Sequence, residues 1–297
     1  MRIVSLVPSA TEMLFALGVG DEVIAVTHEC DHPPEALELP RVTRDVIGPG
    51  LPPGEIDRAV RELTEQGRAI YELDEQALRR LQPDLIVTQA LCAVCAVSYD
   101  DVRAVAERLD SRPQVLALDP HTVGEMLGDV RTLAQATDAK DAGVELVQDA
   151  ARRIDRVRLV VRAAEPVGVA ALEWLDPVFT AGHWTPQLIE YAGGFDLLGR
   201  PGEPSEQRSW DEVRAARPEV VVVMPCGYDA ERALEEALAY ADELESLDAR
   251  RIVAVDAAAH FSRPGPRLVE GLEVLAHILH PDRIPEAPVA VSALEVA

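Results

Sequence analysis

The stretch RIVSLVPSATEMLFALG, residues 2–18, decides how the fold of this chain is interpreted. Its first part is a mostly apolar run, typical of a buried strand, that stops at Pro8. Ser9 and Glu12 stand three residues apart, as in a capping box, and predict a helix over the rest of the stretch. A second apolar run follows at 21–27. A strand, a helix and another strand in this order predict a parallel sheet.

The alternation of strand and helix patterns continues and predicts two α/β lobes. The first lobe closes with strand patterns at 84–88 and 114–118, separated by a helix pattern at 99–109 for which Ser98 is the expected N-cap. After Pro166 the alternation restarts. The elements predicted there are strands at 167–172, 220–224 and 252–256 and helices at 186–191, 230–244 and 266–279.

Between the lobes the sequence has a long helix pattern. Apolar residues from Val144 to Val161 recur in steps of three and four, which predicts one helix over 139–161. We therefore expect an N-terminal α/β lobe, a linking region that contains this helix, and a C-terminal α/β lobe. Their boundaries are 1–120, 121–163 and 164–297.

The charge balance argues against one class of partner. The chain has 52 acidic and 28 basic residues, which gives a net charge of −24 at pH 7. Such an acidic surface repels polyanions, so we expect no nucleic acid partner. No apolar run approaches the roughly 20 residues of a membrane-spanning helix. No export segment precedes the first strand, which predicts a cytoplasmic protein, whereas a native start upstream of Met1 would place it in the periplasm or on the cell surface.

The sequence lacks the common catalytic motifs. It contains no G-x-x-x-x-G-K-[ST], no G-x-S-x-G and no G-x-G-x-x-G after a strand. These are the patterns by which many nucleotide-dependent, hydrolytic and dehydrogenase sites are recognised. These absences give no support to a nucleotide-dependent enzyme, a hydrolase or a dehydrogenase.

Candidate binding residues follow the strands of both lobes. In open parallel sheets a ligand binds outside the carboxyl ends of the strands. In the first lobe this edge carries Pro8, Ser9 and His28. In the second lobe it carries aromatic, imidazole and guanidinium groups, namely Trp174, His183, Trp184, Tyr228, Phe261 and Arg263. Aromatic side chains suit a large planar ligand, and an arginine near a helix N-terminus suits a carboxylate or a phosphate.

All four cysteines lie on the same strand-end segments. They are Cys30, Cys92, Cys95 and Cys226. Three roles stay open for them. Cysteine is often a small core residue, four converging thiolates would hold zinc or an iron–sulfur cluster, and a C-x-x-C pair near a helix start can be redox-active.

Five segments, taken in order, resemble one protein family. They are RIVSLVPSATEMLFALG (2–18), THECDHPPEA (27–36), LQPDLIVTQ (81–89), FTAGHWTPQLIEYAGG (179–194) and FSRPGPRLVEGLEVLAHIL (261–279). Together with the long helix they resemble the cobalamin-binding branch of the periplasmic-type substrate-binding proteins of ABC transporters, in a form without a signal peptide. This helical-backbone class implies two Rossmann-like lobes with parallel sheets, joined by one backbone helix, and a ligand cleft between the lobes.

The resemblance also implies which residues contact the ligand. One wall of the site would be formed by Pro8, Ser9, the 28–32 loop and the loop after Thr88. The other wall would be lined by Trp174, Phe179, His183, Trp184, Phe261 and Arg263.

Two functions are expected from these observations and from the resemblance, and neither is that of an enzyme. The first is a protein that binds a corrinoid, such as cobalamin or cobinamide, or a related metal chelate, with an ABC permease as the partner. The alternative is a cytosolic protein in which the four cysteines hold zinc or an iron–sulfur cluster. A combination of the two has a cysteine thiolate, His28 or His183 coordinating the metal centre of the ligand.

Overall fold

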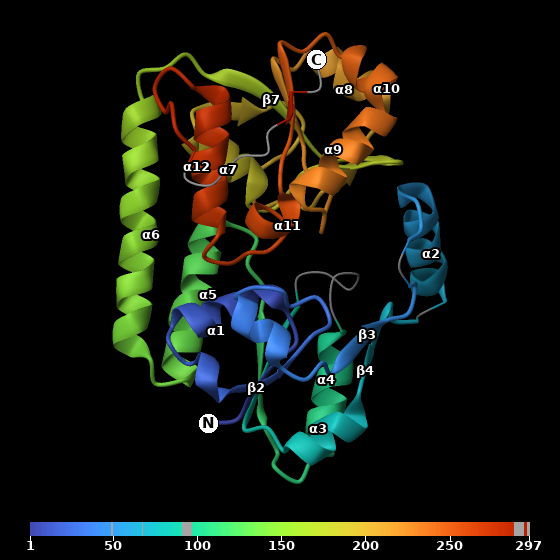
Figure 1. The fold of residues 1–297 in the computed structure, drawn as a ribbon, viewed down its shortest axis with the longest axis vertical. Coiled ribbons are helices and arrows are strands. Elements are labelled where there is room, and N and C mark those ends of the chain that lie inside the picture. The colour runs from blue at the N-terminus through green and yellow to red at the C-terminus, as the bar shows by residue number, and fades with distance from the viewer. Residues whose placement is uncertain (49, 67, 91–96, 288–293, 296–297) are drawn as a thin grey trace. The chain divides into compact units, whose positions relative to one another are not determined.

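The computed structural model describes residues 1–48, 50–66, 68–90, 97–287 and 294–295, and Figure 1 traces its elements. The chain falls into two compact units. Unit 1 consists of Met1–Pro120 and Glu125–Val147, and unit 2 consists of His121–Gly124 and Gln148–Ala297. The residues predicted to form a separate linking region, 121–163, are shared between these units.

Unit 1 is built on a four-stranded parallel sheet, as predicted. In the order β2-β1-β5-β6, its strands span Val23–Val26, Ile3–Ser5, Leu85–Gln89 and Gln114–Leu118. Every residue of β1 and β5 is buried. These central strands are covered on both faces, which explains why their sequences are mostly apolar and do not alternate.

Helix α1, Pro8–Ala16, begins earlier than predicted. Its N-cap is Val7, and no side chain caps the helix. Proline is favoured at the first helical position, because the N–H that it lacks would have no intrahelical partner there. The helix therefore starts at Pro8, Ser9 falls inside the first turn, and the predicted capping box of Ser9 and Glu12 was wrong.

Several other helices belong to unit 1. They are α2 (Pro53–Glu65), α3 (Glu75–Leu81) and α4 (Tyr99–Ala106), and short 3-10 helices span Gly20–Glu22 and Pro34–Glu38. Val4 and Ile86 of the strands are fully buried in one cluster with Val102 of α4. Ser98 is the N-cap residue of α4, as predicted, but its side chain makes no capping hydrogen bond.

A small two-stranded sheet in unit 1 was not predicted. Strands β3 (Thr43–Asp45) and β4 (Tyr71–Leu73) pair antiparallel. The sequence that follows β3 is rich in glycine and proline. Strands of three residues are too short to show a repeating pattern, so only the structure reveals their pairing.

Unit 2 is built on a mixed sheet in the order β10-β8-β7-β11-β12-β13, with β9 paired to the start of β7. In chain order, β7 to β13 span Val167–Leu175, Val178–Thr180, Gly194–Asp196, Glu206–Gln207, Val220–Val223, Arg251–Ala254 and Leu294–Glu295. The strands β7, β11 and β12 are parallel, as predicted, and β9, which was not predicted, is parallel to β7. The strands β8, β10 and β13 pair antiparallel. A turn of only two residues, Asp176–Pro177, joins β7 to β8, and so short a connection can only reverse the chain.

Six helices of the described chain lie wholly in unit 2. They are α7 (Thr185–Tyr191), α8 (Trp210–Ala216), α9 (Ala230–Ala239), α10 (Ala241–Glu245), α11 (Ala257–His260) and α12 (Leu268–Leu279). The predicted helix at 230–244 is divided at Tyr240 into α9 and α10. Helix α8 has a complete capping box, in which the Ser209 side chain accepts from the backbone of Glu212 and the Glu212 side chain accepts from the backbone of Ser209.

Two helices, α5 (Val123–Ala136) and α6 (Lys140–Val161), contribute residues to both units. Helix α6 matches the predicted helix at 139–161 to within one residue. Within unit 2, Arg153 of α6 donates two hydrogen bonds to Glu273 of α12, at 2.9 and 2.6 Å. The hydrogen bond to Glu273 raises the pKa of Arg153, so this bidentate pair stays ionised. In the part of the chain that the structure describes, no helix combines the length and the apolar content needed to cross a membrane.

Candidate functional site

The predicted residues of α1 lie deep in unit 1. Pro8 is buried, and Ser9 has 2% of its surface exposed. Both belong to the first turn of α1, directly after β1. Little of either side chain reaches the surface, so they shape the strand-end edge through the position of the helix start.

His28 follows β2 and is held by a threonine of the small sheet. The hydroxyl oxygen of Thr43 lies 2.8 Å from Nδ1 of His28 and accepts from the His28 backbone N–H at 3.1 Å. Two contacts to one hydroxyl fix both the backbone and the ring of this residue. The imidazole is half-buried, so an oriented ring is presented near the carboxyl end of β2.

Tyr71 of β4 lies beside His28 and was not predicted from the sequence. Its ring centre lies 5.1 Å from that of His28, at an interplanar angle of 54°. The Tyr71 hydroxyl donates to Oε1 of Glu29 at 3.0 Å. Because the tyrosine is 42 residues away from its carboxylate partner, no local pattern indicated this contact. His28, Glu29, Thr43 and Tyr71 form what we call the unit 1 polar group.

Cys30 is a core residue of unit 1. Only 1% of its surface is exposed. Its sulfur lies 3.1 Å from the hydroxyl of Thr11 and 3.5 Å from that of Thr27. The core role, one of the three considered for the cysteines, therefore describes the surroundings of Cys30.

The other cysteines are in different positions. Cys226 is exposed and donates its backbone N–H to the carbonyl of Glu173 at 3.1 Å. Cys92 and Cys95 lie outside the described residues. Among the residues that are described, no three histidine, cysteine or acidic side chains gather in a way that would hold a metal ion. The prediction that four sulfurs converge gains no support from the described part of the chain.

Three aromatic side chains of unit 2 lie together, and we call them the unit 2 aromatic group. Trp174 of β7 and Phe179 of β8 are register partners, so their side chains lie on the same face of the hairpin. The Tyr228 ring meets Trp174 edge-on, with 5.6 Å between ring centres. Trp174 and Phe179 are half-buried, whereas Tyr228 is only 4% exposed. Two of the three rings thus keep surface available for a ligand.

Arg232 of α9 covers the Tyr228 ring. Its guanidinium carbon lies 3.6 Å from the ring centre, within the range of a cation–π contact. Burial raises the pKa of Tyr228, and the positive charge of Arg232 acts in the opposite direction. Tyr228 therefore remains a neutral phenol at physiological pH and acts as a packing surface for Trp174.

Two imidazoles meet at the start of α7. The ring centres of His121 and His183 are 5.6 Å apart, and the planes make an angle of 38°. Both residues are half-buried and belong to unit 2. His183 was predicted and His121 was not, because residues 121–163 were interpreted as a linking region. A histidine soon after the strand pattern 114–118 was the signal available, as it was for His28.

The backbone of His183 is in the left-handed region, with φ of +53°. It is held there by two hydrogen bonds, from its N–H to the Glu203 carbonyl at 2.6 Å and from the Gly202 N–H to its carbonyl at 2.8 Å. A Cβ on the preceding Gly182 would lie 2.4 Å from the backbone nitrogen of Ser205. Only glycine permits this close approach of the two backbone segments, 182–183 and 202–205.

Trp184 and Phe261 form part of the interior of unit 2. They are 6% and 3% exposed, and the indole N–H of Trp184 donates to the Phe261 carbonyl at 2.7 Å. Arg263 is half-buried in the loop that leads to α12, where its carbonyl accepts from the Gly265 N–H at 2.8 Å. Ligand contact by these three residues stays a prediction, and Arg263 has the most surface with which to make it.

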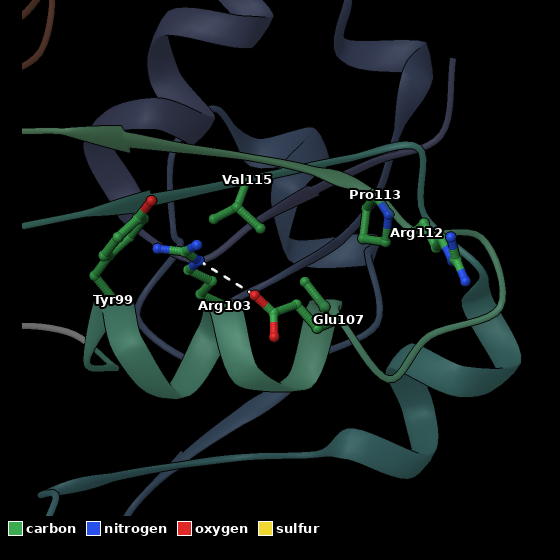
Figure 2. A pocket seen from close by; sticks show the side chains of 7 residues that line it. Tyr99, Arg103, Glu107, Arg112, Pro113 and Val115 are labelled. Carbon is green, nitrogen blue, oxygen red and sulfur yellow. Dashed lines mark ion pairs between the residues drawn. The ribbon is translucent and has the colours of Figure 1, made fainter.

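A separate pocket lies between α4 and β6 of unit 1 (Figure 2). It encloses about 400 Å³ and is lined by Tyr99, Arg103, Ala106, Glu107, Arg112, Pro113 and Val115. Arg103 and Glu107 form an ion pair at 3.3 Å within it. No residue predicted to bind the ligand lines this pocket, so it is distinct from the strand-end edge.

The fold is that of a known class. A model of the periplasmic binding protein family matches residues 3–252, and the chain belongs to this family. One relative, the vitamin B12-binding protein of Vibrio cholerae, is 23% identical over 277 residues, which cover 92% of this chain and 86% of the relative.

Solved structures agree with this assignment at the level of the fold. The periplasmic vitamin B12-binding protein BtuF of Vibrio cholerae superposes with a TM-score of 0.68 at 22% identity, covering 94% of this chain and 96% of that one. The periplasmic haem-binding protein RhuT from Roseiflexus sp. RS-1, in its apo form, gives 0.68 at 25% identity, covering 95% and 98%. The predicted family resemblance, the two-lobe α/β fold and the prediction of a binding protein in place of an enzyme are confirmed. The predicted cytoplasmic location gains no support from these comparisons.

Proposed function

We propose that this protein is a substrate-binding protein whose ligand is a tetrapyrrole-type metal chelate, with a corrinoid such as cobalamin or cobinamide as the first candidate. The unit 2 aromatic group carries this proposal. Trp174 and Phe179 share one face of the β7–β8 hairpin and keep part of their surface exposed. Adjacent aromatic rings offer apolar contact to a large, rigid ring system at little conformational cost. The vitamin B12-binding relatives support the corrinoid within this class.

Haem is the second candidate. The observation that favours it is the presence of oriented imidazole and phenol side chains, in His28 and Tyr71 of unit 1 and His183 of unit 2. Haem iron accepts histidine or tyrosine as an axial ligand. A fold match to a haem-binding protein also supports this candidate.

Titration with cobalamin, cobinamide and haem tests the proposal. Quenching of Trp174 fluorescence should report the binding of one equivalent of ligand at micromolar or tighter affinity, which corresponds to a binding free energy of about −8 kcal/mol or stronger. Replacing Trp174 with Ala should weaken binding about tenfold or more, as expected for a central aromatic contact. Trp210→Phe is the matched control, because Trp210 stacks on Tyr240 at 6.4 Å, outside the aromatic group. Lack of response to all three ligands in the unmodified protein would overturn the proposal.

We further propose that the protein works outside the cytoplasm and passes its ligand to an ABC permease. Membership of the periplasmic binding protein family supports both parts. Expression of the native gene with a C-terminal tag, followed by cell fractionation, tests the location. We expect the tagged protein in the periplasmic or surface fraction, and copurification of a permease after cross-linking. Recovery in the cytosol alone would contradict this part of the proposal.

The zinc or iron–sulfur alternative is not proposed. Cys30, which it needs as a ligand, is packed between two threonine hydroxyls in the core. Metal analysis of protein purified without oxygen checks this point. Stoichiometric zinc or iron that disappears in a Cys30→Ser variant would reinstate the alternative.

A further inference from the structure

We propose that His121 and His183 form a two-imidazole binding site for a divalent first-row transition metal ion, with Cu²⁺, Ni²⁺ and Zn²⁺ as the class of ligand. This site goes beyond the proposed chelate-binding function and does not depend on it. Imidazole is a preferred ligand for these ions, and copper has the highest affinity of the series.

The separation of the two rings fits one shared ion. A metal–nitrogen bond of about 2.0–2.1 Å places the ion about 3.2 Å from each ring centre, so two imidazoles on one ion have centres about 5–6.4 Å apart. The observed separation is 5.6 Å. The remaining coordination positions would be filled by water, since the described residues offer no third histidine, cysteine or acidic ligand in a metal-binding cluster.

Each imidazole is carried on a segment with a fixed backbone. His183 is held in its left-handed conformation by its hydrogen bonds to Glu203 and Gly202. The segment of His121 is bound to α7, the helix that begins two residues after His183. The backbone N–H of Val123 donates to Oε1 of Gln187 in α7 at 2.9 Å. Ligands that are positioned before the ion arrives lose less entropy on binding, which favours a site even with two protein ligands.

The same geometry argues against both rings ligating one planar chelate. A tetrapyrrole occupies the four equatorial positions of its metal and leaves one axial position on each face. Two rings 5.6 Å apart on one side of a macrocycle cannot both reach such a metal. A hydrated ion has adjacent positions open, and this is what a neighbouring pair of imidazoles requires.

The experiment titrates Cu²⁺ into untagged protein and follows binding by calorimetry and by the Cu²⁺ EPR spectrum. Millimolar Mg²⁺ is present throughout to occupy surface carboxylates, since this hard ion prefers oxygen ligands. We expect one equivalent bound at micromolar affinity, with hyperfine coupling to two nitrogen atoms. His121→Asn and His183→Asn should each weaken binding about tenfold or more, and the double variant should resemble either single variant. Asparagine is chosen at 183 because it tolerates the left-handed backbone.

His277→Asn is the matched control. It also lies in unit 2, where its Nδ1 is 2.7 Å from the Ile284 carbonyl, and it should leave Cu²⁺ affinity within about twofold. Circular dichroism confirms that each variant folds. Cu²⁺ binding that is unaffected by both substitutions, or an EPR spectrum with oxygen ligands only, would overturn the site. Corrinoid and haem titrations on the same samples test the proposed function separately. Failure of the copper site can therefore be distinguished from failure of the proposed function.

Discussion

The two units hold their candidate binding residues by different forces. In unit 1, hydrogen bonds orient the polar group, since His28 is hydrogen-bonded to Thr43 and Tyr71 is hydrogen-bonded to Glu29. In unit 2, ring packing orients the aromatic group, with Tyr228 buried beneath Trp174. Hydrogen bonds fix the direction of one atom, whereas packing fixes the position of a whole surface. From this difference we propose that unit 1 recognises a polar or metal-bound feature of the ligand and unit 2 recognises an apolar face.

The largest expected effect is on stability, and it distinguishes a buried tryptophan from a half-buried one in unit 2. Trp184→Ala should lower the free energy of unfolding by about 3–5 kcal/mol, because it leaves a cavity in the interior. Trp174→Ala should cost less stability and more ligand affinity, since Trp174 is half-buried. Urea unfolding of both variants checks this. Equal stability losses would show that Trp174 is also a core residue.

The second prediction concerns one carboxyl in each unit. Burial raises the pKa of Asp196 in unit 2 to about 6, although two backbone N–H groups act against the shift. Such a carboxyl binds more protons in the folded state between its unfolded pKa and about pH 6. Stability should therefore fall as pH rises through this window, by up to about 3 kcal/mol, and stay level above it. In urea unfolding experiments between pH 4 and 7, Asp196→Asn should remove the part of the fall that Asp196 causes and leave the part caused by Asp129, whose pKa is also about 6.

Asp129 in unit 1 has the same displaced pKa, about 6, for partly different reasons. Burial is the larger cause, and repulsion from Asp119 and Glu125 adds to it. Salt screens the repulsion between charges but not the cost of burial. High salt should therefore lower the pKa of Asp129 and leave the pKa of Asp196 unchanged. NMR titration of the two carboxyl carbons at low and high salt provides the measurement. A matching response of the two groups would contradict the difference in cause.

A smaller effect tests the hydrogen bonds of unit 1. Thr43→Val removes the hydroxyl that contacts both the backbone and the ring of His28, at nearly constant volume. We expect a loss of about 1–2 kcal/mol in unfolding free energy, because these polar groups lose their partner. The His28 ring resonances should broaden as the ring gains freedom. Unchanged stability and unchanged resonances would show that Thr43 does not orient the ring.

The smallest effect compares two helix starts. Ser209→Ala should cost about 1 kcal/mol, because Ser209 belongs to a complete capping box in unit 2. Ser98→Ala in unit 1 should cost almost nothing, since that side chain makes no capping hydrogen bond. Thermal unfolding of both variants provides the measurement. Equal losses would indicate that Ser98 caps α4 in solution.

Much of the fold could be predicted from local patterns. The run of apolar residues in β5 and the regular spacing in α6 each identify an element without knowledge of its neighbours. Ser9 shows where such reasoning fails. Its spacing from Glu12 matched a capping box, but the preference of Pro8 for the first helical position decided the start of α1.

The candidate site was less accessible to prediction than the fold. His28 and Trp174 could be selected because each comes at the end of a strand pattern. Tyr71 and Thr43 could not, because they reach His28 through short strands whose pairing depends on distant residues. His121 was missed because the segment between the lobes was assigned a purely connecting role.

Gly182 gives the His183 segment an unusual mutational property. Since the backbone at 182 lies against residues 203–205, a methyl group there would displace the segment without removing any functional side chain. Gly182→Ala is therefore a positional variant, in which the chemistry of the imidazole is kept and its place is changed. Among homologous sequences, Gly182 and His183 should therefore be retained or replaced together. Homologues that have replaced one of them should differ in the ligand that they bind while keeping the same fold.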